Sequence, residues 1–279
     1  MILHKYVNLN GDDIIRNLRI KVSKPTDFND PFEYLPHVMD ISPEQMYDEV
    51  VANEGYLQHL HKYGTSVGSI NKPYESYVTE IKTPAGRTRF LESTPNIAKA
   101  LRVTCKDMQG KPEWILMTCF CSAATESNQE ILMWSHYAYG HRGLRIAFDK
   151  ELLDINDKSF IEIKYEADRV QLNPLDYLRR GNPGFTGAFS KCIKTKSSVW
   201  LYEKEYRWLV VSAQCHKEGN DLFVRINPKA ITEVICGAKC TPEQILAIKD
   251  LVRDNLGDSI KVKKAEIDDY EFKLNYIEC

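Results

Sequence analysis

Two glutamates and an arginine stand at the start of an apolar strand late in the chain. With a period of two, Glu203, Glu205 and Arg207 fall on one face of that strand. Paired carboxylates suit a reaction through an oxocarbenium-like sugar cation, because one stabilises the charge and the other orients or deprotonates the nucleophile. We therefore expect Glu205 and Glu203 to be catalytic and Arg207 to bind a cofactor. The alternative is a solvated strand face on which Arg207 bridges a glutamate.

An early turn offers a second group of polar side chains. Asn29, Asp30 and Glu33 place an amide and two carboxylates in a short segment that Pro31 stiffens. Such a turn holds side chains at fixed angles, and we expect these three to contact a cofactor. Alternatively, the first two satisfy local backbone donors while Phe32 packs in the core.

Aromatic surface and hydrogen-bond donors gather at a predicted helix-to-strand corner. Trp134, His136 and Tyr137 lie late in the helix, and His141 and Arg142 follow just before the strand. This composition suits a flat ligand that carries phosphates. We expect His136 to act in catalysis and the other four residues to bind the ligand. Core packing of the two large aromatic residues, with a structural hydrogen bond from the histidine, is the alternative.

Asp149, Glu162 and Lys164 indicate a different chemistry. Their types and spacing resemble a restriction-endonuclease-like site, in which acids hold Mg²⁺ and a lysine activates water or steadies the phosphate. The wet face of an edge strand shows the same alternation. The cysteine pairs 119/121 and 236/240 are not matched by a second Cys/His pair at the usual spacing, so we expect no bound metal.

Composition places the chain among ordinary globular proteins. Its 279 residues are 43% hydrophobic and 27% charged, enough to bury a core. The formal net charge of -2 and the pI of about 6.4 provide no general attraction for a phosphate backbone. No signal peptide and no apolar run long enough to span a bilayer is recognisable. We expect a cytoplasmic protein with no membrane partner.

The elements that must position these residues predict an α+β fold. Strands that follow one another without crossover helices favour a mainly antiparallel sheet with flanking helices over a doubly wound one. Residues 43–109 are polar and mainly helical, which indicates an insertion into a single domain, 1–279, with its core in 1–42 and 110–279. Periodicity and capping residues predict strands at 3–7, 19–23, 114–121, 143–148, 161–165, 206–211, 222–226, 233–236 and 259–265, and helices at 12–18, 128–139, 185–202 and 241–252.

Three segments together carry a resemblance to a known family. They are SKPTDFNDPFE at 23–33, MWSHYA at 133–138 and YEKEYR at 202–207. In this combination the chain resembles the prokaryotic domain-of-unknown-function 2971 family, over most of its length outside the insertion.

Members of that family in turn resemble the ADP-ribosyltransferase superfamily. The resemblance implies a split antiparallel core that holds NAD⁺ in a cleft, an early-strand ribose contact at Lys5 and Tyr6, and a catalytic glutamate at Glu205. The wall for nicotinamide falls either at 23–26, which includes Ser23, or at 136–137. The Glu-x-Glu pair is similar to that of the subclass that modifies arginine or other nucleophiles.

The implied function is NAD⁺-dependent glycosyl transfer, either as an ADP-ribosyltransferase or as an NAD⁺ glycohydrolase. The resemblance also implies a toxin or effector in bacterial conflict or antiviral defence, with a nucleic acid or protein acceptor and an antitoxin or sensor protein as partner. Two alternatives stay open: a Mg²⁺-dependent nuclease, and a non-catalytic module that senses a nucleotide or a phage component.

Overall fold

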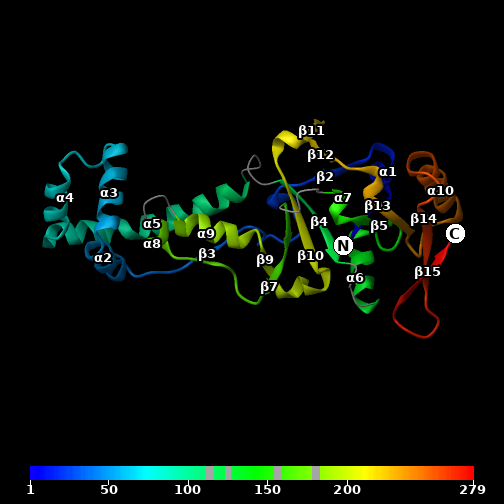
Figure 1. Cartoon of the computed structure of the whole chain (residues 1–279). Helices are drawn as coiled ribbons and strands as arrows, with labels where there is room; N and C mark the ends of the chain where they lie inside the picture. The colour runs from blue at the N-terminus through cyan, green and yellow to red at the C-terminus, as the bar shows by residue number, and fades with distance from the viewer. Residues whose placement is uncertain (111–115, 123–126, 154–158, 178–182) are drawn as a thin grey trace. The chain divides into compact units, whose positions relative to one another are not determined.

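The computed structural model describes residues 1–110, 116–122, 127–153, 159–177 and 183–279 (Figure 1). The chain divides into two compact units. Unit 1 comprises Met1–Phe28, Pro112–Tyr165 and Lys196–Cys279. Unit 2 comprises Asn29–Lys111 and Glu166–Thr195.

Unit 1 is built on a large sheet, which has eight strands in the described part of the chain, in the order β15-β14-β13-β5-β1-β4-β10-β6. Neighbours pair antiparallel except β13 and β14, which are parallel and joined through helix α10. The prediction of a mainly antiparallel α+β fold is therefore confirmed, with one parallel pair that makes the sheet mixed. The strands are β1 (Ile2–Val7), β4 (Leu116–Ser122), β5 (Leu144–Asp149), β6 (Phe160–Glu162), β10 (Glu205–Val210), β13 (Ile231–Cys236), β14 (Lys261–Ile267) and β15 (Leu274–Glu278).

Smaller elements surround this sheet. β2 (Arg19–Val22), β11 (Cys215–Glu218) and β12 (Asp221–Arg225) form a second sheet, and β7 (Lys164–Glu166) pairs with β9 (Thr195–Ser197). The helices and 3-10 turns of unit 1 are α1 (Asp12–Asn17), α6 (Ser127–Tyr137), α7 (Lys150–Leu153), α10 (Pro242–Leu256), η1 (Leu9–Gly11), η2 (Pro25–Asp27), η3 (Ser198–Glu203), η4 (Ser212–Gln214) and η5 (Pro228–Ala230). Thr241 caps α10 through a capping box with Gln244, as its sequence predicts.

The two faces of the large sheet bury different side chains. One face forms the main apolar core, which includes Ile146, Phe148 and Trp208 and extends to residues of α1 and α10. The other face carries α6, whose Trp134 is fully buried in a smaller cluster with Tyr6. Strand alternation assigns each residue of the sheet to one of these faces.

Unit 2 is mainly helical. It contains residues 43–109, predicted to be a helical insertion, together with 29–42 and 166–195. Its core gathers Met46, Tyr47, Leu57 and Phe90. The elements are β3 (His37–Val38), which pairs parallel with β8 (Gln171–Leu172), and the helices α2 (Pro43–Ala52), α3 (Glu54–Ser66), α4 (Tyr74–Ile81), α5 (Pro84–Gly110), α8 (Pro174–Tyr177) and α9 (Pro183–Cys192).

The predicted helix at 185–202 is wrong in its second half. Helix α9 ends at Cys192, and the chain then forms β9 and the turn η3. Thr195, Ser197 and Ser198 carry hydroxyl groups that compete for backbone hydrogen bonds, and β-branched Val199 has low helix propensity. Because the helix ends early, Lys196 lies on an extended segment.

Two further sequence predictions concern a buried strand and membrane-spanning helices. Of the strand predicted at 114–121, residues 116–122 form β4, while 114 and 115 lie outside the described residues. Among the described helices, none combines the length and the apolar character that a bilayer-spanning helix needs.

Candidate active site

Two buried glutamates of unit 1 share one lysine. Lys196 Nζ donates to Glu203 Oε2 at 2.6 Å and to Glu205 Oε2 at 2.9 Å. Glu203 is 4% exposed and Glu205 is 3% exposed. Because both oxygens contact the same nitrogen, the two carboxylates lie within hydrogen-bonding range of one cationic centre.

An arginine closes the other side of Glu205. Arg207 Nε donates to Glu205 Oε1 at 2.6 Å, and the Arg207 side chain is 1% exposed. Its guanidinium carbon lies 5.7 Å from the centre of the Phe28 ring. Glu205 therefore has a cation on each carboxylate oxygen, whereas Lys196 is the one cation paired with Glu203 among the described residues.

The backbone brings the two glutamates together by a route that strand alternation does not predict. β10 begins at Glu205, and Glu203 precedes it as the last residue of η3. Lys204 between them has left-handed backbone angles, φ 44° and ψ 53°, an uncommon conformation for a residue with a side chain. This reversal turns the Glu203 carboxylate toward Lys196.

Tyrosines complete the immediate surroundings of the glutamates. The Tyr137 hydroxyl donates to Glu203 Oε1. The Tyr165 hydroxyl accepts from the Glu205 backbone N–H at 2.8 Å, which fixes the start of β10. His136 Nδ1 lies 2.9 Å from the hydroxyl of Tyr202, and the His136 side chain is exposed.

The environment separates the acidities of the two glutamates. Burial and the negative charge of Glu205 raise the pKa of Glu203, although Lys196 and Tyr137 oppose the shift. Burial alone would also raise the pKa of Glu205, but the positive charges of Arg207 and Lys196 outweigh it and lower that pKa below its ordinary value. Glu205 stays ionised, and Glu203 is the carboxyl that more readily holds a proton.

The pairing register places Lys5 on the opposite face of the sheet. Glu205 pairs with Cys121, and Cys121 pairs with His4, so these three side chains share one face. Lys5 follows His4 and points the other way, where its Nζ donates to Thr118 Oγ1 at 2.8 Å and to the Cys119 carbonyl at 2.9 Å. Lys5 thus does not face the glutamates.

Tyr6 and Trp134 share the face of the glutamates but pack in its core. Their ring centres lie 5.2 Å apart in an edge-on arrangement, and Trp134 Nε1 donates to the hydroxyl of Tyr276 at 3.3 Å. His141 stacks on Trp134, with Nε2 3.1 Å from the hydroxyl of Ser135. These contacts fit the core-packing interpretation of this corner.

The remaining predicted site residues lie in three other places. Arg142 is exposed and follows α6. Ser23 pairs its backbone with Met117 of β4, with N···O distances of 2.8 and 3.0 Å. Asn29, Asp30 and Glu33 belong to unit 2, where the last two are buried.

Within that turn of unit 2, Asp30 serves the backbone. Its Oδ1 accepts from the Phe32 N–H at 2.9 Å, the local role that its turn composition allows. A site shared by this turn and Glu205 stays a prediction.

The residues of the nuclease alternative lie on strands that are not neighbours. Asp149 is on β5 and Glu162 on β6, with β1, β4 and β10 between them. Four strand spacings separate these strands by about 19 Å. Asp149 Oδ1 instead accepts from the Glu151 N–H at 3.0 Å. Among the described residues, no group of three His, Cys, Asp or Glu side chains is arranged to hold a metal ion.

Sequence reasoning missed Lys196, the residue that joins the two glutamates. The segment Thr195-Lys196-Ser197-Ser198 lies inside the helix predicted at 185–202, and a lysine there reads as solvent-exposed. The cluster of three hydroxyl residues around it is the signal for extended backbone. Cys119, also unpredicted, lies on the glutamate face opposite Arg207, and burial followed by the charge of Glu205 raises its pKa.

Comparison with known proteins gives one match. The family model described as "Protein of unknown function (DUF2971)" matches residues 133–208. Over this segment the chain is similar to that family. The matched segment is about a quarter of the chain and includes His136, Tyr137, Lys196, Glu203, Glu205 and Arg207. No curated protein and no solved structure matches the chain.

Proposed function

We propose that this chain cleaves the bond between ribose and nicotinamide in NAD⁺ and passes the ADP-ribosyl group to an acceptor or to water. The observation that carries the proposal is the pair of buried glutamates on one ammonium group, with Glu205 also held by Arg207. Two carboxylates that converge on one positive centre supply the electrostatic environment that an oxocarbenium-like ribose cation requires.

Glu205 is the charge-stabilising group in this proposal. When the glycosidic bond breaks, nicotinamide leaves as a neutral base with the bonding electrons, and positive charge develops on the ribose. Because its pKa is lowered, Glu205 is ionised when that charge appears. The Lys196 ammonium is carried on a flexible side chain and can move aside. The developing ribose cation then replaces the ammonium between the two carboxylates.

Glu203 is the proton acceptor. The nucleophile forms its bond to the ribose carbon and loses a proton to Glu203, the carboxylate that shares Lys196 with Glu205. Its raised pKa makes it a stronger base than an ordinary glutamate. His136 and Tyr137, next to Glu203, form the binding surface for the nicotinamide or ribose end of the substrate in this proposal.

The test measures nicotinamide released from NAD⁺ by the wild type and by Glu205→Gln, with protein, RNA and DNA offered as acceptors. The substitution keeps shape but removes the charge, and the rate should fall about a hundredfold to a thousandfold. Glu162→Gln is the matched control, because Glu162 lies on the neighbouring strand opposite Tyr206, on the other sheet face. No nicotinamide release by the folded wild type would refute the proposal, and equal rates in wild type and Glu205→Gln would refute the role of Glu205.

Glu203→Gln separates the two steps of the reaction. It should slow transfer to an acceptor more than hydrolysis, because water is in excess while a transferred nucleophile depends on its base. Labelled ADP-ribose incorporated into acceptor, divided by nicotinamide released, reports the partition. A ratio unchanged from wild type would contradict the assignment of Glu203 as base.

The biological setting of this proposal rests on the family resemblance. A toxin or defence effector that consumes NAD⁺ or modifies nucleic acid or protein would be held in check by an antitoxin or sensor protein. Growth arrest on expression of the wild type, relieved by Glu205→Gln, tests this extension.

A further inference from the structure

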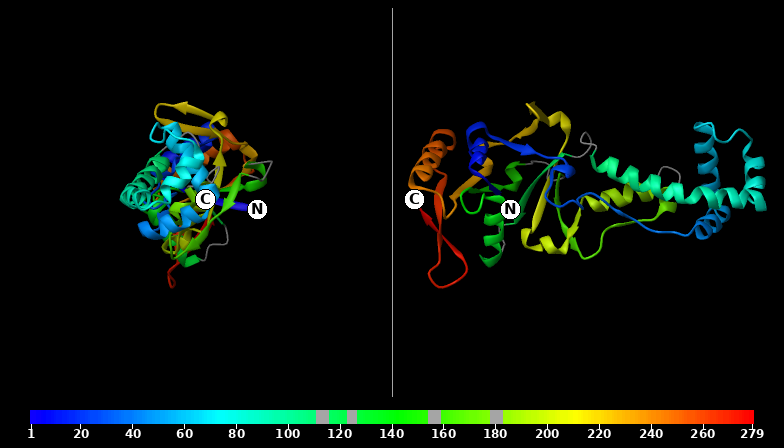
Figure 2. Two further views of the ribbon diagram at one scale, coloured as in Figure 1. Left: turned by 90° about the vertical axis from the view of Figure 1, so that its left-hand side faces the viewer. Right: turned by 180° about the vertical axis from the view of Figure 1, so that it is seen from behind.

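The β14–β15 hairpin of unit 1 ends one side of the large sheet. In the described residues, β15 hydrogen-bonds only to β14. The hairpin is drawn in red, and its turn projects away from α10 (Figures 1 and 2). A strand at such an edge presents a row of backbone donors and acceptors that can pair with another chain.

The direction of these backbone groups follows from one hydrogen bond. The Cys279 N–H donates to the Val262 carbonyl at 3.2 Å, so it points toward β14. Backbone groups alternate in direction along a strand. The N–H groups of Leu274, Tyr276 and Glu278 therefore point away from the sheet.

The turn of the hairpin holds two aromatic side chains in solvent. Tyr270 is 96% exposed and Phe272 is 92% exposed. Asp268 fixes the turn, because its Oδ1 accepts from the N–H groups of Tyr270 and Glu271, both at 2.9 Å. Its Oδ2 accepts from Asn275 Nδ2 at 2.9 Å. A turn built this rigidly presents its aromatic residues at little entropic cost to a partner.

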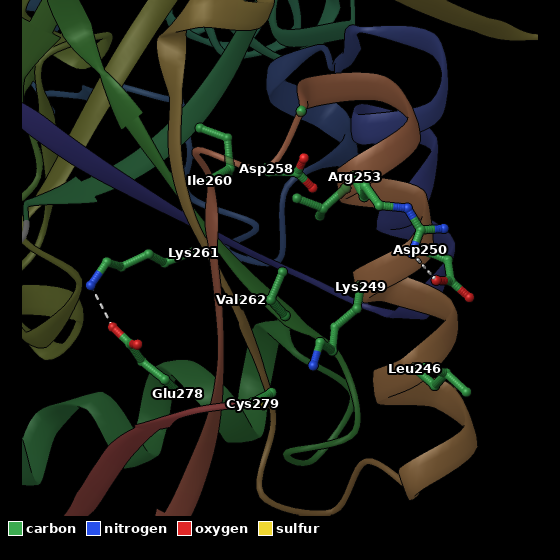
Figure 3. A pocket seen from close by; sticks show the side chains of 12 residues that line it. Leu246, Lys249, Asp250, Arg253, Asp258, Ile260, Lys261, Val262, Glu278 and Cys279 are labelled. Atoms are coloured by element: carbon green, nitrogen blue, oxygen red, sulfur yellow. Dashed lines mark hydrogen bonds and ion pairs between the residues drawn. The ribbon is translucent and has the colours of Figure 1, made fainter.

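A groove of about 410 Å³ lies at the other end of the same hairpin (Figure 3). Helix α10 contributes Leu246, which is 59% exposed, and Lys249, and the start of β14 contributes Val262. Glu278 and Cys279, at the end of β15, complete that side. The groove and the turn are separated by the length of β14, roughly 20 Å.

We infer that β15 pairs antiparallel with β15 of a second copy of this chain, and that the turn of each copy packs its aromatic residues into the groove of the other. Antiparallel pairing about a two-fold axis brings the start of one β15 beside the end of the other. The turn precedes β15 and the groove lies at its end, so one operation brings both contacts together.

One charged residue on each surface agrees with this arrangement. Asp269 in the turn and Lys249 in the groove each make no ion pair among the described residues. The turn from 268 to 273 has three acids and one lysine. These acids would repel the phosphates of nucleic acid or of an anionic membrane, which favours a protein partner with a free cation.

The contact is small, since β15 has five residues and each turn adds two aromatic side chains. We therefore expect association at micromolar concentrations, below the affinity of a standard-size interface. Sedimentation velocity of the full chain from roughly 1 to 100 µM should show a reversible monomer–dimer equilibrium.

Paired variants test each contact. Tyr270→Ser with Phe272→Ser should weaken the dimer about tenfold or more without lowering the melting temperature, because the monomer exposes both rings. Glu278→Pro removes an outward N–H, while the matched Glu278→Ala removes the same side chain and keeps the N–H. Dimer loss in the proline variant alone identifies strand pairing.

A charge swap gives the sharpest outcome. Lys249→Glu and Asp269→Lys should each weaken association, and the variant with both changes should recover it. A wild type that stays monomeric at 100 µM overturns the inference. So does a dimer that the aromatic, proline and charge-swap variants leave unchanged.

Discussion

Among the described residues, two buried charge clusters lie on the same face of the large sheet, and they differ in how their charges are shared. In the first, Glu203 and Glu205 share the ammonium of Lys196. In the second, Arg145 Nη1 donates to Glu130 Oε1 at 2.8 Å. Both clusters are almost inaccessible to solvent, so burial of charge does not distinguish them.

In the second cluster, neighbouring side chains also hold Glu130 and Arg145. The Tyr276 hydroxyl donates to Glu130, and the Tyr276 ring lies 4.3 Å from the guanidinium carbon of Arg145. Glu233 lies on the far side of Arg145, at 3.6 Å, and pairs with Lys263. An arginine keeps its charge at every physiological pH, so the cation of this cluster is fixed.

The first cluster instead holds two carboxylates against the same ammonium, with Arg207 as a second cation on Glu205. Their pKa values move in opposite directions, which leaves one carboxylate fixed and the other able to accept a proton. In the proposed function, this unequal acidity of the close carboxylate pair, rather than buried charge alone, marks the first cluster as the active centre.

The largest expected effect is common to both clusters. Lys196→Met and Arg145→Met should each lower the free energy of unfolding by about 3 to 5 kcal/mol, because a buried carboxylate loses its partner. Urea unfolding at neutral pH measures the change. An unchanged unfolding midpoint for Lys196→Met would contradict the existence of the buried network around the glutamates.

Neutralising one carboxylate in each cluster should change the free energy of unfolding differently in the two clusters. Glu130→Gln should destabilise the protein by about 1 to 3 kcal/mol, because charge-assisted hydrogen bonds are lost. Glu203→Gln should be close to neutral or stabilising at pH 7, because a carboxyl with a raised folded pKa costs stability when it ionises.

The pH dependence of unfolding shows whether ionisation of Glu203 stabilises or destabilises the fold. Folded Glu203 binds its proton more tightly than the unfolded chain does, so wild-type stability should fall as pH rises from 4.5 through the folded pKa of Glu203. Unfolding free energies of the wild type, minus those of Glu203→Gln, should decrease across this interval. A difference that increases with pH would show that the ionised form is favoured by the fold.

The smallest expected effect concerns Tyr137. Tyr137→Phe removes the hydrogen bond to Glu203 and should cost about 1 kcal/mol of stability. Because this bond favours the ionised carboxylate, its loss should raise the pKa of Glu203 further. The acidic limb of the pH–rate profile for ADP-ribosyl transfer to an acceptor should then move to higher pH.

Local patterns predicted several elements well. Alternating residues located β1 and β5, and the capping residue Thr241 located the start of α10. Period two also separates neighbouring residues of a strand onto two faces, but it does not say which face meets the site. Lys5 was predicted to bind a cofactor and lies on the face opposite Glu205.

Sequence periodicity does not predict the order of strands in the sheet or the places where the backbone reverses direction. Asp149 and Glu162 have suitable types, yet nothing local indicates that three strands separate them. The left-handed turn at Lys204 and the early end of α9 depend on tertiary context. Together they position Lys196, so the residue that joins the site could not be read from periodicity.

The different roles proposed for Glu203 and Glu205 are tested most directly by titrating their side chains. Carbon-13 NMR of the glutamate carboxyl groups, assigned with Glu203→Gln and Glu205→Gln, reports each pKa in the folded protein. We predict a pKa above 4.5 for Glu203 and below 4.5 for Glu205. Two equal values, or the reverse order, would contradict the assignment of Glu205 as the fixed charge and Glu203 as the base.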